Sequence, residues 1–305
     1  MALNKGVAIS NFYAQINGQS GGYLESFTPP TIEVEQINLP LGPDGISKSA
    51  GGRMKFGDVK GVTNISEANA LWQLIESVMN KNCQEFEAVF GLADQNYKSI
   101  REIEMTECLM SEVSFSDLDA KDGKKLFQCT FTFKPTEVKY SNGSQAVIKG
   151  NLSNKAKGWQ CSYFVPNGFG PLPAEAITKI SLSKHTAKVV EEHLGMRRRP
   201  TKVHAAWECK GLKWEGSAAH GGYEAARDWA IKLMHDGEFQ EAEFIDPSCN
   251  IMAPNHKDIV GQILWTEVAP YKFTTAPEAK GGADGAAQWT LEMFSATQKI
   301  DIKHK

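Results

Sequence analysis

The sequence contains the same order of segments twice, and this internal repeat limits the fold more than any other feature of the chain. In the first copy, an alternating segment at 31–37 (TIEVEQI) and a glycine- and proline-rich excursion at 39–52 precede a second alternating segment at 53–60. A run with apolar residues at helical spacing follows at 67–79, with Ser66 as the expected N-cap. More strand-like segments complete the copy, and such a repeat predicts two units folded on one plan.

The second copy follows the same order with little sequence identity. An alternating segment at 178–183, a second excursion and a segment at 201–210 (TKVHAAWECK) lead to an amphipathic stretch at 223–235. Within that stretch Trp229 takes the place that Trp72 has in the first copy. One such correspondence could arise by chance, but a series of them in one order indicates a tandem duplication.

The stretch at 141–157 (SNGSQAVIKGNLSNKAK) has the composition of a linker, being poor in large apolar residues and rich in Ser, Asn, Gly and Lys. We therefore predict two tandem domains, 1–145 and 158–305, joined by a linker at 146–157. Each would contain one helix among about six strands, and short connections favour antiparallel pairing. The expected fold class is mainly β with one helix per unit (α+β), as two open barrels or sandwiches.

Composition places the chain among globular proteins and disfavours several partners. Hydrophobic residues make up 41% and charged residues 23% of the 305 residues, so a substantial core can form. The formal net charge of −3 gives no basic excess for tight nucleic-acid binding, although weak contact with DNA is allowed. The sequence has no apolar run of transmembrane length and no signal-peptide pattern, so we expect a chain made in the cytosol.

The first copy resembles the phage tail tube family, whose relatives include type VI secretion tubes and the tubes of contractile injection systems. The residues that carry the resemblance are 52–59 (GRMKFGDV), the Gly-Val-Thr-Asn step at 61–64, the segment 113–118 (VSFSDL) and the strand end at 137–139 (EVK). Order and spacing carry it over roughly residues 10–140, since no single motif is diagnostic. The second copy matches the family mainly through the first.

The resemblance implies a structural virion protein that is not an enzyme and needs no cofactor or metal. Family members are implied to form six-membered rings stacked into a tube, so three tandem chains would close a pseudo-hexameric ring. Sheet edges left open by each domain would pair between neighbours. The implied partners are further copies of the chain, sheath, baseplate and tail-terminator proteins of a bacteriophage, and DNA in transient, non-specific passage. The subunit would assemble in the host cytoplasm, end in the virion tail and insert into no membrane.

Strand alternation supplies candidates for the wall of such a tube. Glu33 and Glu35 project from one face of their strand, while Lys179, Ser181 and Ser183 occupy the matching face in the second copy. A polar wall with little net positive charge would let DNA slide. The alternative interpretation of all five is an ordinary solvent-facing surface.

The two excursions, 39–52 and 185–200, are the second feature shared with the family, in which a hairpin at this point reaches the next ring. Loops of this length are either functional or disordered, so a plain surface loop is the alternative. The arginine run favours carboxylate partners in an inter-subunit loop over nucleic acid. The candidate inter-ring residues are Leu41, Asp44, Lys48, Arg197, Arg198 and Arg199.

Six cysteines lie far apart in the sequence and include no C-x-x-C pair, a spacing that disfavours zinc ribbons and thioredoxin-type motifs. Reduced thiols, several of them buried, are the first interpretation. Cross-links between subunits in an oxidising medium are the second, with Cys83, Cys161 and Cys249 as candidates. Both interpretations stay open on the sequence alone.

The sequence contains few matches to catalytic motifs. The segment 18–22 (GQSGG) matches G-x-S-x-G, but two prolines in the following segment argue against the helix that a nucleophile elbow needs, so a hairpin turn is favoured.

Among the tryptophans of the second half, only Trp159 and Trp214 lie where exposure is expected, which makes a carbohydrate-binding β module the least favoured alternative. A tube-initiating or baseplate hub protein and an effector-delivery tube of a contractile injection system are the nearer alternatives.

Overall fold

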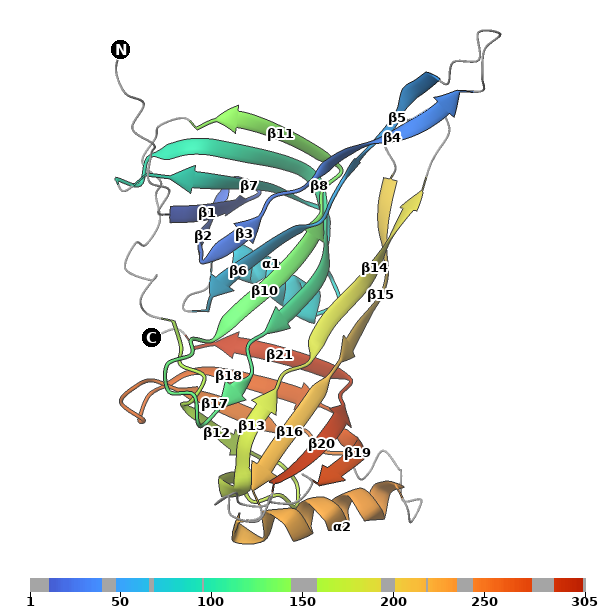
Figure 1. Cartoon of the computed structure of the whole chain (residues 1–305). Helices are drawn as coiled ribbons and strands as arrows, with labels where there is room; N and C mark the ends of the chain where they lie inside the picture. Colours follow the sequence, from blue (N-terminus) through green and yellow to red (C-terminus); the bar gives the residue numbers. More distant parts are fainter. Residues whose placement is uncertain are drawn as a thin grey trace, which may run out of the picture.

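The computed structural model describes residues 11–39, 48–65, 69–94, 96–143, 158–192, 201–217, 219–234, 244–275 and 288–303. In these ranges the chain is mainly β, with antiparallel sheets and two α-helices, which confirms the predicted fold class (Figure 1). None of the described sheets closes into a barrel. The expected linker at 146–157 lies outside the described residues, and the division into two domains stays a prediction.

A ten-stranded sheet dominates the upper part of Figure 1. Its main path has the order β2-β1-β7-β8-β10-β6-β3, with β11 added to the first part of β8. The backbone of Glu107 within β8 has a positive φ of 49°, and β11 pairs with β8 before this residue whereas β10 pairs with it after this residue. The bounds of these strands are β1 (Asn11–Ile16), β2 (Gln19–Leu24), β3 (Ser26–Thr28), β6 (Val59–Asn64), β7 (Phe86–Ala93), β8 (Ser99–Phe115), β10 (Gln128–Lys134) and β11 (Glu137–Asn142).

The second half forms most of two smaller sheets, of orders β12-β17-β18-β21 and β19-β20-β16-β13-β9, and β9 comes from the first half. Glu267, between β18 and β19, has a φ of 52°. It lies at the same place in the strand order of the second half as Glu107 does in the first, and its backbone has the same unusual conformation. The bounds are β9 (Leu118–Asp119), β12 (Phe164–Asn167), β13 (Ile177–Ser181), β16 (Leu212–Ser217), β17 (Ser248–Met252), β18 (Ile259–Thr266), β19 (Ala269–Thr275), β20 (Gln288–Phe294) and β21 (Thr297–Ile302).

Each half has one long hairpin in place of the expected excursion. The first consists of β4 (Ile32–Leu39) and β5 (Lys48–Phe56), and the second of β14 (Lys184–Glu192) and β15 (Thr201–Lys210). In Figure 1 both project in the same direction beyond the sheets. Both also carry a β-bulge, between Val34 and Gln36 in β4 and between Ala187 and Val189 in β14. A bulge at the same step marks the two hairpins as structural equivalents.

The two α-helices cover the sheets with apolar faces. Helix α1 (Ala70–Met79) buries Leu71 and Ile75, and the side chain of Asn69 caps it by accepting a hydrogen bond from the N–H of Trp72 at 2.9 Å. The expected cap, Ser66, lies outside the described residues. Helix α2 (Gly222–Met234) buries Ala226, Trp229 and Leu233. Short 3₁₀ turns occur at Ala174–Ala176 and Ala219–Gly221.

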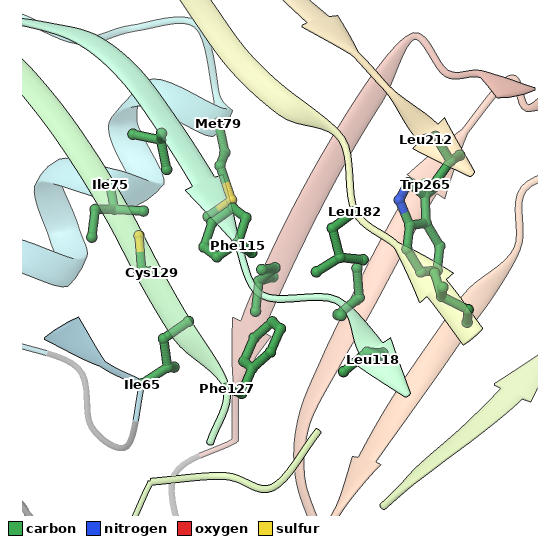
Figure 2. Packing of buried hydrophobic residues seen from close by; sticks show 14 of the residues in the cluster. Ile65, Ile75, Met79, Phe115, Leu118, Phe127, Cys129, Leu182, Leu212 and Trp265 are labelled. Atoms are coloured by element: carbon green, nitrogen blue, oxygen red, sulfur yellow. The ribbon is translucent and has the colours of Figure 1, made fainter. Parts of the chain in front are cut away.

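The buried side chains form one continuous cluster through both halves. Phe127 joins its two parts, because its ring stacks on Phe115 at 6.1 Å and on Trp159 at 6.2 Å. Figure 2 shows Phe115, Phe127, Leu118 and Leu182 at this boundary. Trp159 and Trp214 are buried rather than exposed as expected, since each packs against other aromatic rings. They therefore offer no exposed platform for a sugar.

Candidate assembly edges and polar sheet face

The two halves are joined by strand pairing at two adjacent places. Strand β14 of the second half adds to the edge of β8, with His185 opposite Val113 and Thr186 opposite Glu112. Strand β9 adds to the edge of β13, where Leu118 lies opposite Ile180. One edge of the first half is thus completed by the hairpin edge of the second, which satisfies backbone groups that an open edge leaves unpaired.

Side chains hold this junction as well. Lys184 Nζ lies 2.8 Å from a Glu112 carboxylate oxygen, and Lys179 Nζ lies 3.3 Å from Asp117. His204 Nε2 is 2.6 Å from the carbonyl oxygen of Met110, and the buried Lys202 ammonium donates to the carbonyl of Pro135. Burial lowers the pKa of Lys202. The hairpin therefore contributes basic groups to a first-half edge that supplies acidic and carbonyl oxygens.

The same two types of edge occur again at the opposite ends of the chain, and there they have no strand partner among the described residues. Strand β3 ends the path of the large sheet, and β4 pairs with β5 on one side only, among the described residues. In the second half, β19 ends its sheet and, within the described residues, pairs only with β20. The β4–β5 hairpin exposes Ile32 (48%), Val34 (50%) and Met54 (55%). An isolated two-stranded ribbon of this kind is marginally stable in water, so both edges are suited to further pairing.

The sheet face opposite the core is polar and rich in ion pairs. In the first half it carries Thr130 and Thr132 of β10, which pair with Ser114 and Glu112 of β8. In the second half it carries closely paired charges, which bring cations and carboxylates together in about equal number. The contacts there are Lys213–Glu215 at 2.7 Å, Lys272–Glu292 at 2.6 Å and Lys179–Glu215 at 3.8 Å, and the first half adds Lys134–Asp58 at 3.7 Å.

The predicted lumen-facing residues lie in different surroundings. Glu33 and Glu35 are exposed on β4, whereas Lys179 and Ser181 are half-buried on β13. Ser183 is fully buried: its N–H donates to Gln298 Oε1 at 2.8 Å, so we leave it out of the lumen-facing set. The hairpin bulges also align Glu33 with Thr186 rather than with the serines and lysine of β13.

Of the predicted inter-ring residues, Lys48 lies in the described part of the chain. Lys48 begins β5 and its backbone pairs with Leu39, and nothing is described of its side chain. Leu41, Asp44, Arg197, Arg198 and Arg199 lie outside the described residues.

All six cysteine thiols are free, and four of them are buried and two are half-buried. Of the three proposed for cross-links, Cys161 and Cys249 are fully buried and Cys83 is half-buried. Burial raises the pKa of the Cys161 thiol to about 12 and also raises the pKa values of Cys83 and Cys249. A thiol that stays protonated and enclosed reacts slowly, so the reduced interpretation fits these positions best.

Chemistry elsewhere in the described chain is sparse. Ser20 of the G-x-S-x-G match lies in β2, paired with Gln15 after a tight turn, as the hairpin interpretation predicted. A pocket of about 730 Å³ is lined largely by Phe12, Phe27, Phe90 and other apolar side chains. No group of three or more potential metal ligands occurs within the described residues, and none of their helices is long and apolar enough to span a bilayer.

Comparison with known proteins finds partial structural similarity. No family model and no curated protein matches the sequence. A chain of the anti-feeding prophage tube-terminating cap is 10% identical, with 47% of this chain and 95% of that chain covered and a TM-score of 0.41. A chain of the PVC sheath–tube complex, an extracellular contractile injection system, is 10% identical, with 46% and 94% covered and a TM-score of 0.40. Hcp1 from Flavobacterium johnsoniae is 11% identical, with 44% and 97% covered and a TM-score of 0.27.

The first two of these known chains come from a tube-terminating cap and from a sheath–tube complex, and this chain is similar to each over part of its length. In each of these three comparisons, nearly the whole of the known chain corresponds to less than half of this one.

Proposed function

We propose that this chain is a structural tube subunit of a phage-type tail, which acts by assembly and passage and not by turnover. The observation that carries the proposal is the junction between its halves: an open edge of β8 receives the hairpin strand β14, and among the described residues the same two types of edge have no strand partner at β19 and at β3–β4. A head-to-tail contact of this kind gives a closed ring when its rotation closes.

Two domains, 1–145 and 158–305, would then occupy successive positions of one ring. Three chains would complete a pseudo-hexameric ring, and rings would stack through the two hairpins that project in the same direction (Figure 1). Sheath, baseplate and tail-terminator proteins are the partners that such a tube requires.

The polar sheet face supports a role as the wall of a DNA conduit. Its lysines are paired with carboxylates in the chain, as Lys213 is with Glu215 and Lys272 with Glu292. Binding to phosphates grows with each cation available to neutralise them, so a paired, near-neutral surface holds DNA only weakly. Glu33, Glu35, Lys179 and Ser181 remain our candidates for its border.

The test is electron microscopy of the purified full-length chain over a range of concentrations, together with mass measurement by light scattering. We expect rings or tubes with three chains per layer. A protein that stays monomeric at high concentration contradicts the proposal. Single rings that never extend would instead identify a tube-initiating or hub protein.

A further inference from the structure

The structure lets the two hairpins be aligned residue by residue. In β14, Ala187 pairs with Trp207 just before the bulge, and in β4 Val34 pairs with Met54 at the same step. Counting back from this shared bulge makes Ile32 the equivalent of His185 and Glu33 the equivalent of Thr186. These are the two positions at which β14 pairs with β8.

The receiving edges can be aligned in the same way. Strand β8 has one extra residue, Ser111, between the partners of Thr132 and Phe133 in β10. Strand β19 has one extra residue, Tyr271, between the partners of Glu292 and Met293 in β20. Counting from these bulges makes Lys272 the equivalent of Glu112, and Phe273 the equivalent of Val113.

From these two alignments we propose a specific contact between two copies of this chain: β4 of one copy adds to β19 of the next, with Glu33 opposite Lys272 and Ile32 opposite Phe273. The inference rests on the self-assembly proposed above and adds its strand register. It transfers to the chain's outer edges the pairing that the chain already makes between His185 and Val113 and between Thr186 and Glu112.

The residues at the transferred positions are complementary. Glu33 is exposed on β4, and the Lys272 side chain is 57% exposed although it contacts Glu292. Oppositely charged residues directly across an antiparallel pair stabilise it, and a lysine can bridge two carboxylates. Ile32, about half exposed, would cover the partly buried ring of Phe273, which already packs on Tyr223.

The charges at the two junctions are reversed relative to each other. Within the chain the receiving edge is acidic at Glu112, and the hairpin supplies the cation from Lys184, two positions before Thr186. Between chains the receiving edge is basic at Lys272 and the hairpin is acidic at Glu33. A first-half hairpin placed on the wrong edge would set Glu33 against Glu112, and like charges directly opposite are unfavourable. The reversal therefore favours strict alternation of first and second halves.

Charge reversal with rescue tests the register. Glu33→Lys and Lys272→Glu should each raise the concentration needed for assembly about fivefold to tenfold, because each replaces an attraction by a repulsion. The double variant should recover most of the loss. Glu85→Lys, at an exposed position outside both edges, is the matched control and should assemble like the unmodified chain. Sedimentation velocity measures the assembly, and circular dichroism checks that each variant is folded.

The outcomes separate the register from the proposed function. If the unmodified chain forms no oligomer, the proposed function itself fails. If it assembles, but Glu33→Lys behaves like Glu85→Lys or the double variant gives no recovery, the register is wrong while the tube role stands. Glu33→Lys is the more informative single variant, because Lys272→Glu also places a carboxylate beside Glu292 within the chain.

Disulfide trapping gives a second measurement that does not depend on charge. In an Ile32→Cys, Phe273→Cys variant, oxidation should link copies into dimers and trimers on non-reducing gels, since directly opposed Cβ atoms lie within disulfide range. Moving one cysteine by two positions, in Val34→Cys with Phe273→Cys, should reduce the yield at least severalfold. Equal yields from the two pairs would overturn the register.

Discussion

Leu118 of the first half and Ile180 of the second lie opposite each other in an antiparallel pair, and both side chains are fully buried. The packing of one half therefore depends directly on the other. This contact lies next to the β8–β14 junction. It therefore connects the strand pairing between the halves to the shared core.

Removing the Leu118 side chain should destabilise the chain as a whole. Leu118→Ala deletes buried methyl groups and leaves a cavity, for which a loss of about 2–5 kcal/mol in the free energy of unfolding is expected. Ile231→Ala, at an exposed position of α2, should cost less than about 0.5 kcal/mol. Chemical denaturation followed by tryptophan fluorescence measures both. A loss at Leu118 as small as that at Ile231 would contradict the shared core.

Acidification should weaken the junction through His185. This side chain is buried, and burial, with a smaller effect of Lys81, lowers its pKa to about 4. The unfolded chain has a normal histidine pKa near 6.5 and so binds more protons between pH 6.5 and pH 4, which means that stability falls as the pH falls through this range. The full contribution is on the order of 3 kcal/mol.

The measurement is the difference in unfolding free energy between pH 7 and pH 4.5, for the unmodified chain and for His185→Leu. The variant cannot take up the proton, so it should lose less stability on acidification. His256→Gln, at an exposed turn, serves as the control and should keep the original pH dependence. An unchanged slope in His185→Leu would show that another group is responsible.

A methyl group at Gly61 should also be poorly tolerated. A Cβ atom at this position in β6 would overlap the ring of Phe131, which lies across from it in β10. We expect Gly61→Ala to lower the unfolding free energy by about 1–3 kcal/mol, the usual cost of overpacking. Thermal unfolding measures both this variant and the control Gly123→Ala, which should have little effect because a Cβ there meets nothing within 4 Å.

The N-cap of α1 provides a smaller and more local effect. Asn69→Ala removes the acceptor for the Trp72 N–H and should cost about 0.5–2 kcal/mol, whereas Asn69→Asp keeps an acceptor and should lose much less. Hydrogen exchange of the amides in the first turn of α1 should rise in the alanine variant alone. Equal exchange in both variants would argue against the cap.

Much of the fold could be predicted because it depends on local patterns. Alternation of Cys129, Phe131 and Phe133 with polar neighbours predicts a strand with one buried face, and these three residues are fully buried in β10. The helical spacing around Trp72 likewise predicts α1. The exact cap was missed because several residues near a helix start can accept the same hydrogen bond, and Asn69 lies closer to the first turn than Ser66.

The assembly edges could not be predicted, because they depend on contacts between distant segments. Nothing in the sequence near His185 indicates that it pairs with Val113, and the excursions gave no alternating pattern strong enough to identify them as hairpins. Ser183 was misplaced for a similar reason. Alternation assigns it to the polar face, but the strand changes its pairing partner between β13 and β14, and this turns Ser183 towards Gln298.

The pairing of β14 with β8 has a kinetic consequence for any closed ring built from this chain. One of every two neighbour contacts is already formed when folding is complete, so its loss of translational and rotational freedom belongs to folding and not to association. Half as many contacts then remain to be formed by encounters in solution before the circle closes.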